Sequence, residues 1–379
     1  MMTDVNRRLF LTGSAAATGL AAMANTQVLA ATAQAKQVGG LFGPLAGNAQ
    51  LSRNENPFGP APSALQAVSD TMAKGCYYAD RGVRKLTEMI AERHNVSPSQ
   101  VVVGSGSTEI LSAVALAWGR KGSILCPGLF WDTTVQYGER QGAKAIRVPL
   151  AGDMNVDLPA MQAAMNDSVS LVHICNPNNP TAMLADPAAM RRFAGQVLPK
   201  ATLLVDEAYN ELVDDPEGNS LIDLVRDGKD VIVCRTFSKI YGMAGMRVGY
   251  GITSEENASL IRGYLMSFGG NVSGLAAAIG SYNDTAFLTR SKAMIREGRE
   301  MILDAVSRAG LTALPSQTNF VYVEVPDADA VQKAMAERGV SIRGAYGDWT
   351  QYSRVSTGKM DDVQRYAAAL PEIIDKLRV

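Results

Sequence analysis

Short apolar segments alternate along the chain with longer segments in which apolar residues recur every three or four positions. The short segments are rich in β-branched residues and predict strands. Between residues 101 and 252 they are Val101–Val103, Ser123–Cys126, Ala145–Val148, Ser170–Ile174, Thr202–Val205, Val231–Cys234 and Arg247–Ile252. Buried strands separated by helices are typical of a mainly parallel sheet with helices on both faces. We therefore predict an α/β fold whose larger part has three layers, α/β/α.

The pattern changes towards the C-terminus, where strands alternate with amphipathic helices and indicate a smaller α+β domain. The strands expected there are Ala313–Val325, Val340–Arg343 and Ser353–Ser356. Prolines recur before the first helix and predict an extended N-terminal arm. The expected divisions are an arm over residues 34–60, a large domain over residues 61–265 and a small domain over residues 266–379.

The N-terminus has the parts of an export signal. The sequence Asn6-Arg7-Arg8-Leu9-Phe10-Leu11 precedes a weakly apolar run that ends near Ala30. An arginine pair, a hydrophobic stretch and small residues before a cleavage position resemble a twin-arginine signal. A membrane helix is the alternative, but the run is shorter than the ~20 continuous apolar residues that a span needs. We expect residues 1–33 to be a twin-arginine-type signal, and the mature protein to be periplasmic without a membrane segment.

Composition limits the classes of partner. The chain has 379 residues, of which 47% are hydrophobic, and this is enough for a sizeable core. Its 36 basic and 37 acidic residues leave a formal net charge of -1, which argues against nucleic acid as a partner. Two histidines, His94 and His173, and four cysteines without paired spacing do not make a metal centre. We expect no metal, and an organic cofactor or none.

A glycine turn follows the first predicted strand of the sheet. Gly104-Ser105-Gly106-Ser107-Thr108 leads into a helical run, so free backbone N–H groups meet the positive end of a helix dipole. This arrangement suits a phosphate group, although an ordinary strand-to-helix turn has the same pattern. A dinucleotide fingerprint would have a third glycine where Glu109 stands, and this disfavours a nicotinamide site.

Three further polar segments follow predicted strands. They are Asn176-Pro177-Asn178-Asn179-Pro180-Thr181, Asp206-Glu207-Ala208-Tyr209 and the run from Arg235 to Tyr250, which includes Lys239 and Arg247. A lysine in a dry site can become an amine nucleophile, an arginine offers a fork suited to phosphate, and a buried acid needs a partner. Each segment alone is also compatible with a turn, a capping acid or a surface charge. Ligands of open α/β sheets bind where strands end, as these segments do.

Taken in this order, the segments resemble those of the pyridoxal-phosphate-dependent aminotransferases of fold type I, class I/II, in particular the histidinol-phosphate aminotransferase-like branch. The resemblance runs from Leu51-Ser52-Arg53-Asn54-Glu55-Asn56-Pro57-Phe58-Gly59-Pro60 to Arg354-Val355-Ser356-Thr357-Gly358, nearly the whole mature chain. It implies the type I PLP-transferase fold, pyridoxal 5'-phosphate as cofactor, and a homodimer with shared active sites.

The resemblance also assigns catalytic residues. Lys239 matches the lysine that holds the cofactor as a Schiff base. Asp206 matches the acid that faces the pyridine nitrogen, and its charge keeps that nitrogen protonated. Tyr209 and Asn179 match the donors to the ring hydroxyl.

The remaining matches concern the cofactor phosphate, the ring face and the substrate. The expected phosphate ligands are Gly106, Ser107, Thr108, Thr236, Ser238 and Arg247. Tyr78 matches a tyrosine that the second subunit lends to the phosphate, and Trp131, with Phe130 in reserve, is expected to stack on the ring. Arg354 matches the arginine that binds the substrate carboxylate, and Asn56 lies in the arm that closes over substrate.

These matches imply an EC 2.6.1-type transaminase that moves an amino group between an amino acid, or a related amine, and a 2-oxo acid by a ping-pong mechanism. A decarboxylase, lyase or racemase on the same scaffold, or an exported and catalytically silent binding protein, is the alternative. Arg343 and Arg53 are candidates to bind a second anionic group, although either could be a surface charge. Because histidine biosynthesis is cytoplasmic, the expected export favours a substrate other than histidinol phosphate.

Overall fold

The computed structural model describes residues 40–378. The predicted signal, residues 1–33, lies outside the described residues, so export stays a prediction. The chain divides into two compact units, Met1–Asn48 and Ala49–Val379. In the first unit the described residues form turns, one of them closed by a hydrogen bond from Asn48 N to Leu45 O. The second unit is described below by itself.

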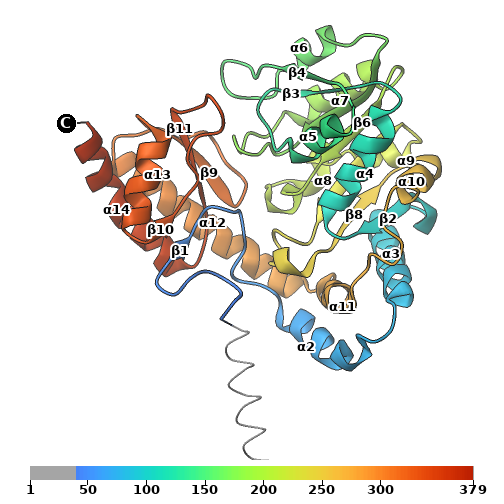
Figure 1. The fold of residues 1–379 in the computed structure, drawn as a ribbon, viewed down its shortest axis with the longest axis horizontal. Coiled ribbons are helices and arrows are strands. Elements are labelled where there is room, and N and C mark those ends of the chain that lie inside the picture. The colour runs from blue at the N-terminus through green and yellow to red at the C-terminus, as the bar shows by residue number, and fades with distance from the viewer. Residues whose placement is uncertain (1–39, 379) are drawn as a thin grey trace, which may run out of the picture. The chain divides into compact units, whose positions relative to one another are not determined.

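A seven-stranded sheet forms the centre of the second unit (Figure 1). The strands lie in the order β2-β8-β7-β6-β5-β3-β4, and β8 is antiparallel to both neighbours while the other pairs are parallel. Their bounds are β2 Val101–Gly104, β3 Ser123–Pro127, β4 Ala145–Val148, β5 Val169–Cys175, β6 Thr202–Asp206, β7 Val231–Thr236 and β8 Gly249–Ile252. The mainly parallel sheet confirms the predicted fold class. Strand β8 begins two residues later than predicted, because Arg247 adopts a left-handed conformation with φ 54°.

Helices connect and cover these strands. They are α2 Pro62–Thr71, α3 Asp80–His94, α4 Ser107–Gly119, α5 Thr133–Arg140, α6 Leu158–Ala163, α7 Pro187–Val197, α8 Pro216–Asn219, α9 Ile222–Arg226, α10 Glu255–Arg262 and α11 Val272–Ser281, with short 3-10 turns η1 Met72–Lys74, η2 Pro98–Gln100, η3 Asn210–Leu212 and η4 Ala244–Met246. Local sequence explains several starts. Before α7, the side chain of Asp186 accepts a hydrogen bond from Ala189 N at 2.7 Å, and Pro187 opens the helix.

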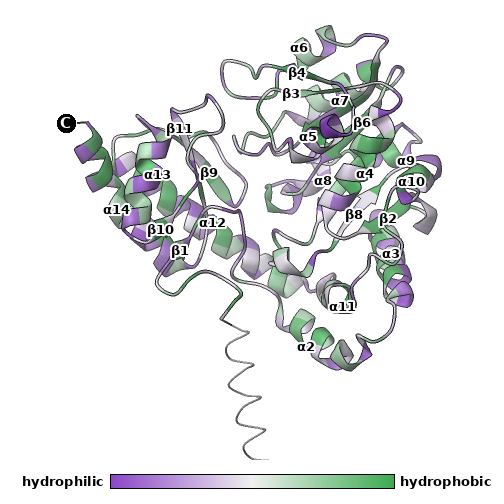
Figure 2. Ribbon diagram, in the orientation of Figure 1, coloured by the Kyte–Doolittle hydropathy of each residue, from purple (hydrophilic) through white to green (hydrophobic). Residues whose placement is uncertain are grey.

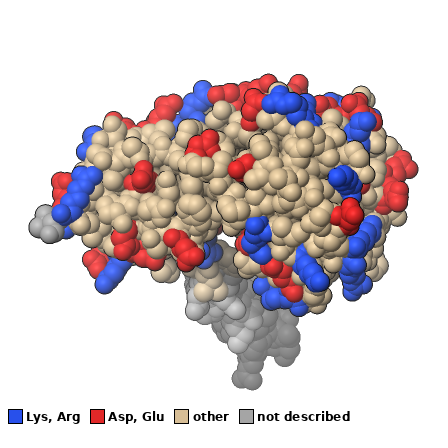
Figure 3. Space-filling view, turned by 90° about the horizontal axis from the view of Figure 1, so that it is seen from above, with Lys and Arg blue, Asp and Glu red and all other residues tan. Residues whose placement is uncertain are grey.

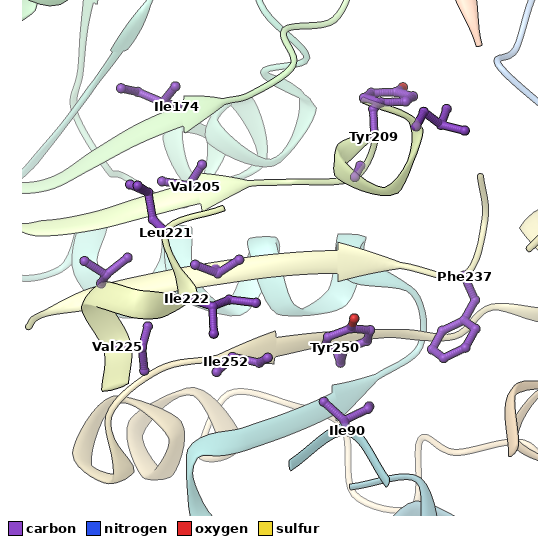
Figure 4. Packing of buried hydrophobic residues seen from close by; sticks show 14 of the residues in the cluster. Ile90, Ile174, Val205, Tyr209, Leu221, Ile222, Val225, Phe237, Tyr250 and Ile252 are labelled. Atoms are coloured by element: carbon purple, nitrogen blue, oxygen red, sulfur yellow. The ribbon is translucent and has the colours of Figure 1, made fainter. Parts of the chain in front are cut away.

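Both faces of the sheet are buried, because successive residues of a strand point to opposite faces. On one face, Leu171 of β5 packs in a cluster with Ile110 of α4. On the other face, Ile174 of β5 and Val205 of β6 pack in a cluster with Ile222 of α9, as Figure 4 shows. The predicted three-layer arrangement follows from this alternation.

A second group of elements forms the small domain, drawn in orange and red in Figure 1 except for the blue β1. Its strands are β1 Ala49–Gln50, β9 Phe320–Glu324, β10 Val340–Ser341 and β11 Tyr352–Ser356, and its helices are α12 Thr285–Arg308, α13 Ala328–Glu337 and α14 Met360–Leu377. Strands β9 and β11 pair antiparallel, and β1 pairs parallel with β10. Helices α13 and α14 show alternating hydrophobic and hydrophilic bands in Figure 2, as expected for helices with one buried face.

The boundary between the two buried clusters lies within α12. Ile295 belongs to the cluster under the large sheet, whereas Ile302 belongs to the cluster of the small domain. The sequence prediction placed the division earlier, at residue 266. The difference arises because α11 packs against α2 through Leu275 and its neighbours in the first cluster.

The segment after β1 contacts both cores. Leu51 is buried in the small-domain cluster, and its carbonyl accepts a hydrogen bond from Ser356 N at 2.8 Å. Five residues later, Asn56 Nδ2 donates to Ile240 O and to Ser291 Oγ, both at 2.8 Å. This part of the predicted arm is therefore fixed at both ends by packing and hydrogen bonds.

Charged side chains of both signs are interspersed on the face drawn in Figure 3, most of them near its rim. Within residues 40–378, no helix is both long enough and apolar enough to cross a membrane. The same residues contain no group of three or more histidine, cysteine, aspartate or glutamate side chains that could hold a metal ion. All four cysteines are free.

Candidate active site

A pocket of about 580 Å³ opens where strands β5, β6 and β7 end. The sequence-predicted residues that line it are Ser107, Thr108, Trp131, Asn179, Asp206, Tyr209, Thr236, Ser238, Lys239, Arg247 and Arg354. They come from seven different segments of the chain. Most of them follow parallel strands, whose carboxyl ends meet at one edge of the sheet, whereas Arg247 precedes the antiparallel β8 and Arg354 comes from β11 of the small domain.

Lys239 extends its amine into this pocket from the turn that follows β7. Ser238 N donates to Thr236 Oγ1 at 3.1 Å, and the Thr236 hydroxyl donates to Ser238 Oγ at 2.9 Å, so the turn is internally bonded. The Nζ atom of Lys239 donates to the main-chain carbonyl of Asn54 at 3.1 Å. Burial, aided by the nearby Arg354 cation, lowers the pKa of Lys239 from 10.5 to about 8. The amine is therefore able to lose its proton near neutral pH.

Two adjacent acids at the end of β6 have different surroundings. Glu207 forms a buried ion pair with Arg235 of β7, at 2.8 Å. Asp206, only 5% exposed, accepts a hydrogen bond from Ala208 N at 3.2 Å and lies 4.0 Å from the Cys175 thiol. No ion pair to Asp206 forms within residues 40–378. Burial consequently raises the pKa of Asp206 from 3.8 to about 7.

The hydroxyl of Tyr209 is surrounded by amide groups. Asn54 Nδ2 donates to it at 3.1 Å and Asn179 Nδ2 donates to it at 3.3 Å. The ring packs edge-on against Phe320, with centroids 5.1 Å apart. Because both amides act as donors, the hydroxyl proton of Tyr209 is left for an acceptor in the pocket.

The first turn of α4 provides a second polar wall. Gly106, with φ 79°, precedes Ser107 and Thr108, whose backbone N–H groups belong to the unpaired first turn of the helix. A Cβ atom at Gly106 would overlap the guanidinium of Arg247, so only glycine allows this close approach. Hydroxyls, helix N–H groups and a guanidinium thus converge as an anion site.

Arg354 of β11 lies on the opposite, small-domain side of the pocket. It is buried, and it donates to Asn179 Oδ1 at 2.6 Å and to Ser52 O at 2.7 Å. Its Nε has no hydrogen-bond partner among the described residues. Both oxygens that it contacts are neutral, so a carboxylate would be a stronger partner for this cation.

Three predicted site residues do not line the pocket: Gly106, which lies in the turn just before Ser107, Asn56 and Tyr78. Asn56 is buried by its bonds to Ile240 and Ser291, and the prediction that it faces substrate is not supported by this position. Tyr78 is 76% exposed, and its ring lies 4.6 Å from that of Phe268. Neither ring belongs to the pocket of its own chain.

Sequence reasoning missed Asn54, which lines the pocket where Asn56 was expected. The motif Asn54-Glu55-Asn56-Pro57 contains two asparagines, and the pattern alone does not distinguish them. Asn54 has φ 54°, and asparagine tolerates this left-handed conformation better than most residues. Phe130 lines the pocket beside Trp131.

Comparison with known proteins gives a consistent answer. Residues 48–370 match the family model "Aminotransferase class I and II". A histidinol-phosphate aminotransferase of Brevibacillus brevis is 33% identical over 330 residues, 86% of this chain and 90% of that protein. One from Cupriavidus pinatubonensis is 36% identical over 332 residues, 86% of this chain and 88% of that protein.

A solved structure of similar fold contains the cofactor. It is a histidinol-phosphate aminotransferase from Sinorhizobium meliloti in complex with pyridoxal-5'-phosphate, with a TM-score of 0.79, 30% identity, and 86% of this chain and 91% of that chain covered. Together with the family model, these relatives confirm the predicted cofactor, pyridoxal 5'-phosphate. The chain belongs to the class I and II aminotransferases, in their histidinol-phosphate aminotransferase-like branch, and transfers amino groups between amino acids and 2-oxo acids.

Proposed function

We propose that this aminotransferase acts on an amino donor with more than one anionic group, and that Lys239 carries the proton in the transfer. The observation that supports the proposal is the meeting of one lysine, one unpaired aspartate and several arginines at a single pocket. The lysine and aspartate lie on the large-domain side of the pocket. Two of the arginines, Arg343 and Arg354, come from the small domain.

The residues present fit pyridoxal phosphate. Asp206 is a buried carboxylate without a cationic partner in the described chain, and a protonated pyridine nitrogen would supply that partner. The first turn of α4 and Arg247 offer N–H groups and a guanidinium for the phosphate. We infer that Trp131 covers one face of the ring, because it lines the same pocket.

When bound, the cofactor withdraws electrons from the donor carbon that carries the amino group, and this makes the proton on that carbon acidic. Lys239 has an amine whose pKa is lowered to about 8, so its neutral form is available to take that proton and return it. The Tyr209 hydroxyl and the Asn179 amide lie next to each other in the pocket, and both could donate a hydrogen bond to the hydroxyl oxygen of the cofactor ring. Arg354 would exchange its two neutral acceptors for the substrate carboxylate.

The outer part of the pocket indicates the substrate class. Arg53 and Arg343 line the pocket together with Arg354. Arg53 and Arg343 also line an adjoining hollow of about 450 Å³ together with Lys333. No acidic side chain is among the residues that line this hollow. Relatives named histidinol-phosphate aminotransferases make phosphate a candidate for the second anion, and a distal carboxylate would be recognised by the same cations.

We infer a homodimer in which Tyr78 of each chain reaches the neighbouring active site. Tyr78, Met266 and Phe268 are large apolar side chains that are 76%, 71% and 65% exposed, and clustered exposure of this kind marks an interaction surface. A hollow lined by Met266 and Phe268 is also lined by Arg247, so this surface adjoins the proposed phosphate site.

Replacing Lys239 with alanine removes the proposed proton carrier. We expect Lys239→Ala to lower kcat for transfer from glutamate to a 2-oxo acid by roughly 10²–10⁴-fold or more. Lys229→Ala, which changes an exposed lysine outside the pocket, is the control and should keep full activity. Retained turnover in Lys239→Ala would contradict the assignment.

Asp206 should destabilise the protein when the cofactor is absent. At pH 8 its carboxyl is ionised in both folded and unfolded chains, so the folded state bears the full cost of a pKa raised from 3.8 to about 7. We expect Asp206→Asn to raise the unfolding free energy of the cofactor-free protein by roughly 2–4 kcal/mol at pH 8. Near pH 3 the carboxyl is mostly protonated in both states, so most of the gain should disappear. Urea titrations at the two pH values measure this.

The neighbouring acid gives a matched control for that experiment. Glu207 is the nearer of the two carboxylates paired with Arg235, the other being Glu211, so Glu207→Gln removes a charge-assisted hydrogen bond and should destabilise the protein by about 1.5–3 kcal/mol. A loss of stability on Asp206→Asn at pH 8, in the same direction as Glu207→Gln, would show that Asp206 has a partner already.

Arg343 should select donors with a second anionic group. We expect Arg343→Gln to lower kcat/KM by about 10–100-fold for glutamate and for histidinol phosphate, since one charge-assisted hydrogen bond is lost. For alanine the change should stay within about twofold. Arg296→Gln, at an exposed arginine of α12 paired with Asp214, is the control. An equal loss of kcat/KM for all donors would show that Arg343 has a structural role and does not determine substrate specificity.

Mixing two inactive variants tests whether Tyr78 acts across a dimer interface. A hybrid of Tyr78→Ala and Lys239→Ala chains contains one site with both residues intact, so we expect co-expression to restore activity. The pair Lys239→Ala and Asp206→Asn should not restore it, because both residues serve the pocket of their own chain. Complementation by neither pair would argue against a shared site.

A further inference from the structure

Asn54 occupies the point where the small domain meets the reactive side chains of the pocket. The residue is 1% exposed and has φ 54°. All of its polar groups form hydrogen bonds, and these bonds extend in two directions. One set anchors it to strands of the small domain, and the other contacts Lys239 and Tyr209.

The anchoring bonds come from β11 and from the residue before β9. The Ser356 hydroxyl accepts from Asn54 N at 2.9 Å and donates to Asn54 Oδ1 at 2.7 Å. Asn319 Nδ2 donates to Asn54 O at 2.9 Å. Ser356 and Asn319 are themselves buried at 1% and 0% exposure. Main chain and side chain of Asn54 are thus both fixed to the small domain.

The remaining polar groups of Asn54 contact Lys239 and Tyr209 in the pocket. Its carbonyl oxygen accepts a second hydrogen bond, from Lys239 Nζ at 3.1 Å, so both of its lone pairs are used. Its amide donates to the Tyr209 hydroxyl at 3.1 Å. Asparagine suits this position because it tolerates a left-handed backbone and offers a donor and an acceptor at once.

We propose that Asn54 is a positioning residue that transmits the placement of the small domain to the amine of Lys239 through its carbonyl and to the hydroxyl of Tyr209 through its amide. The inference rests on the proposed role of Lys239 as proton carrier. One N–H of the amine is directed to Asn54 O, so the orientation of the remaining substituents of Nζ is set by a group that β11 holds.

The hydrogen bond from Lys239 Nζ to Asn54 O also affects the basicity of the amine, because a hydrogen bond from the ammonium form favours that form. Burial is the main influence on the pKa of Lys239 and lowers it. The charged groups that act on the amine from the surrounding elements are Arg354, Asp206, Glu55 and Arg247, with the Tyr209 ring 5.5 Å from Nζ. Displacing the main-chain carbonyl of Asn54 should leave these influences in place and lower the pKa of Lys239 further.

Ser356→Ala tests the coupling from outside the pocket, since Ser356 does not line it. The readout is the pH dependence of acetylation of the Lys239 amine by acetic anhydride in the full-length, cofactor-free protein, followed by mass spectrometry of the Lys239 peptide. We expect the pKa of Lys239 to fall by about one unit relative to the unmodified sequence. In the holoenzyme, kcat should fall by about tenfold while KM for the donor stays within about twofold.

Ser281→Ala is the matched control. Like Ser356, Ser281 is a buried serine whose hydroxyl is hydrogen-bonded. Its partner is the main-chain carbonyl of Ala277, at 2.8 Å, and it has no bond to Asn54. It should lower thermal stability without moving the pKa of Lys239. An equal pKa shift in Ser281→Ala, or no shift in a folded Ser356→Ala protein, would overturn the proposal.

A second variant keeps the proposal testable if Ser356→Ala does not fold. Asn54→Gly retains access to the left-handed backbone and removes the side chain. It should lower the pKa of Lys239 in the same direction, and adding Ser356→Ala to it should lower the pKa little further, because both changes remove the bond between the Ser356 hydroxyl and the Asn54 side chain and so loosen the same main-chain carbonyl. Fully additive shifts would overturn the proposal. Loss of the Lys239 proton-carrier role itself would instead appear as full turnover in Lys239→Ala.

Discussion

The buried carboxylate of Asp206 is the constraint on which the pocket depends. Its neighbour Glu207 is neutralised by Arg235, which joins the ends of β6 and β7. Asp206 points to the other side of the same strand and has no cation of its own in the described chain. An unpaired buried charge is costly, and such a cost persists in folded proteins mainly where a ligand or a reaction uses it. The same dry surroundings lower the pKa of Lys239, so one environment prepares both groups.

Much of the large domain could be predicted from the sequence because its signals are local. Most strands of the sheet are buried and largely apolar, edge strand β4 with its exposed Arg147 being an exception, and each strand was expected within a few residues of its observed bounds. The polar segments at the ends of β5, β6 and β7 had to meet once the strands were parallel. The sequence therefore predicts that these segments share one site, and the resemblance to aminotransferases assigns Lys239, Asp206, Asn179 and Tyr209 within it.

Other features depend on contacts between distant segments and leave no local signal. The choice between Asn54 and Asn56 is made by Ser356, about 300 residues later in the chain, whose hydroxyl bonds to Asn54. Strand β8 begins later than expected because Arg247 has a left-handed backbone conformation. The guanidinium of Arg247 lies against Gly106, a residue 141 positions earlier in the chain. The expected boundary at residue 266 ignored the packing of α11 on α2, which no periodicity reveals.

The proposed phosphate ligands have a consequence for heat tolerance. Ser107 and Arg247 belong to the edge of the sheet formed by β2 and β8, whereas Asp206 and Lys239 follow central strands. A ligand that contacts all four would tie the rim of the sheet to its middle and bind only the native state. By mass action, the melting temperature would then rise with the concentration of free cofactor. The heat resistance of the protein would thus depend on how much cofactor surrounds it as well as on its sequence.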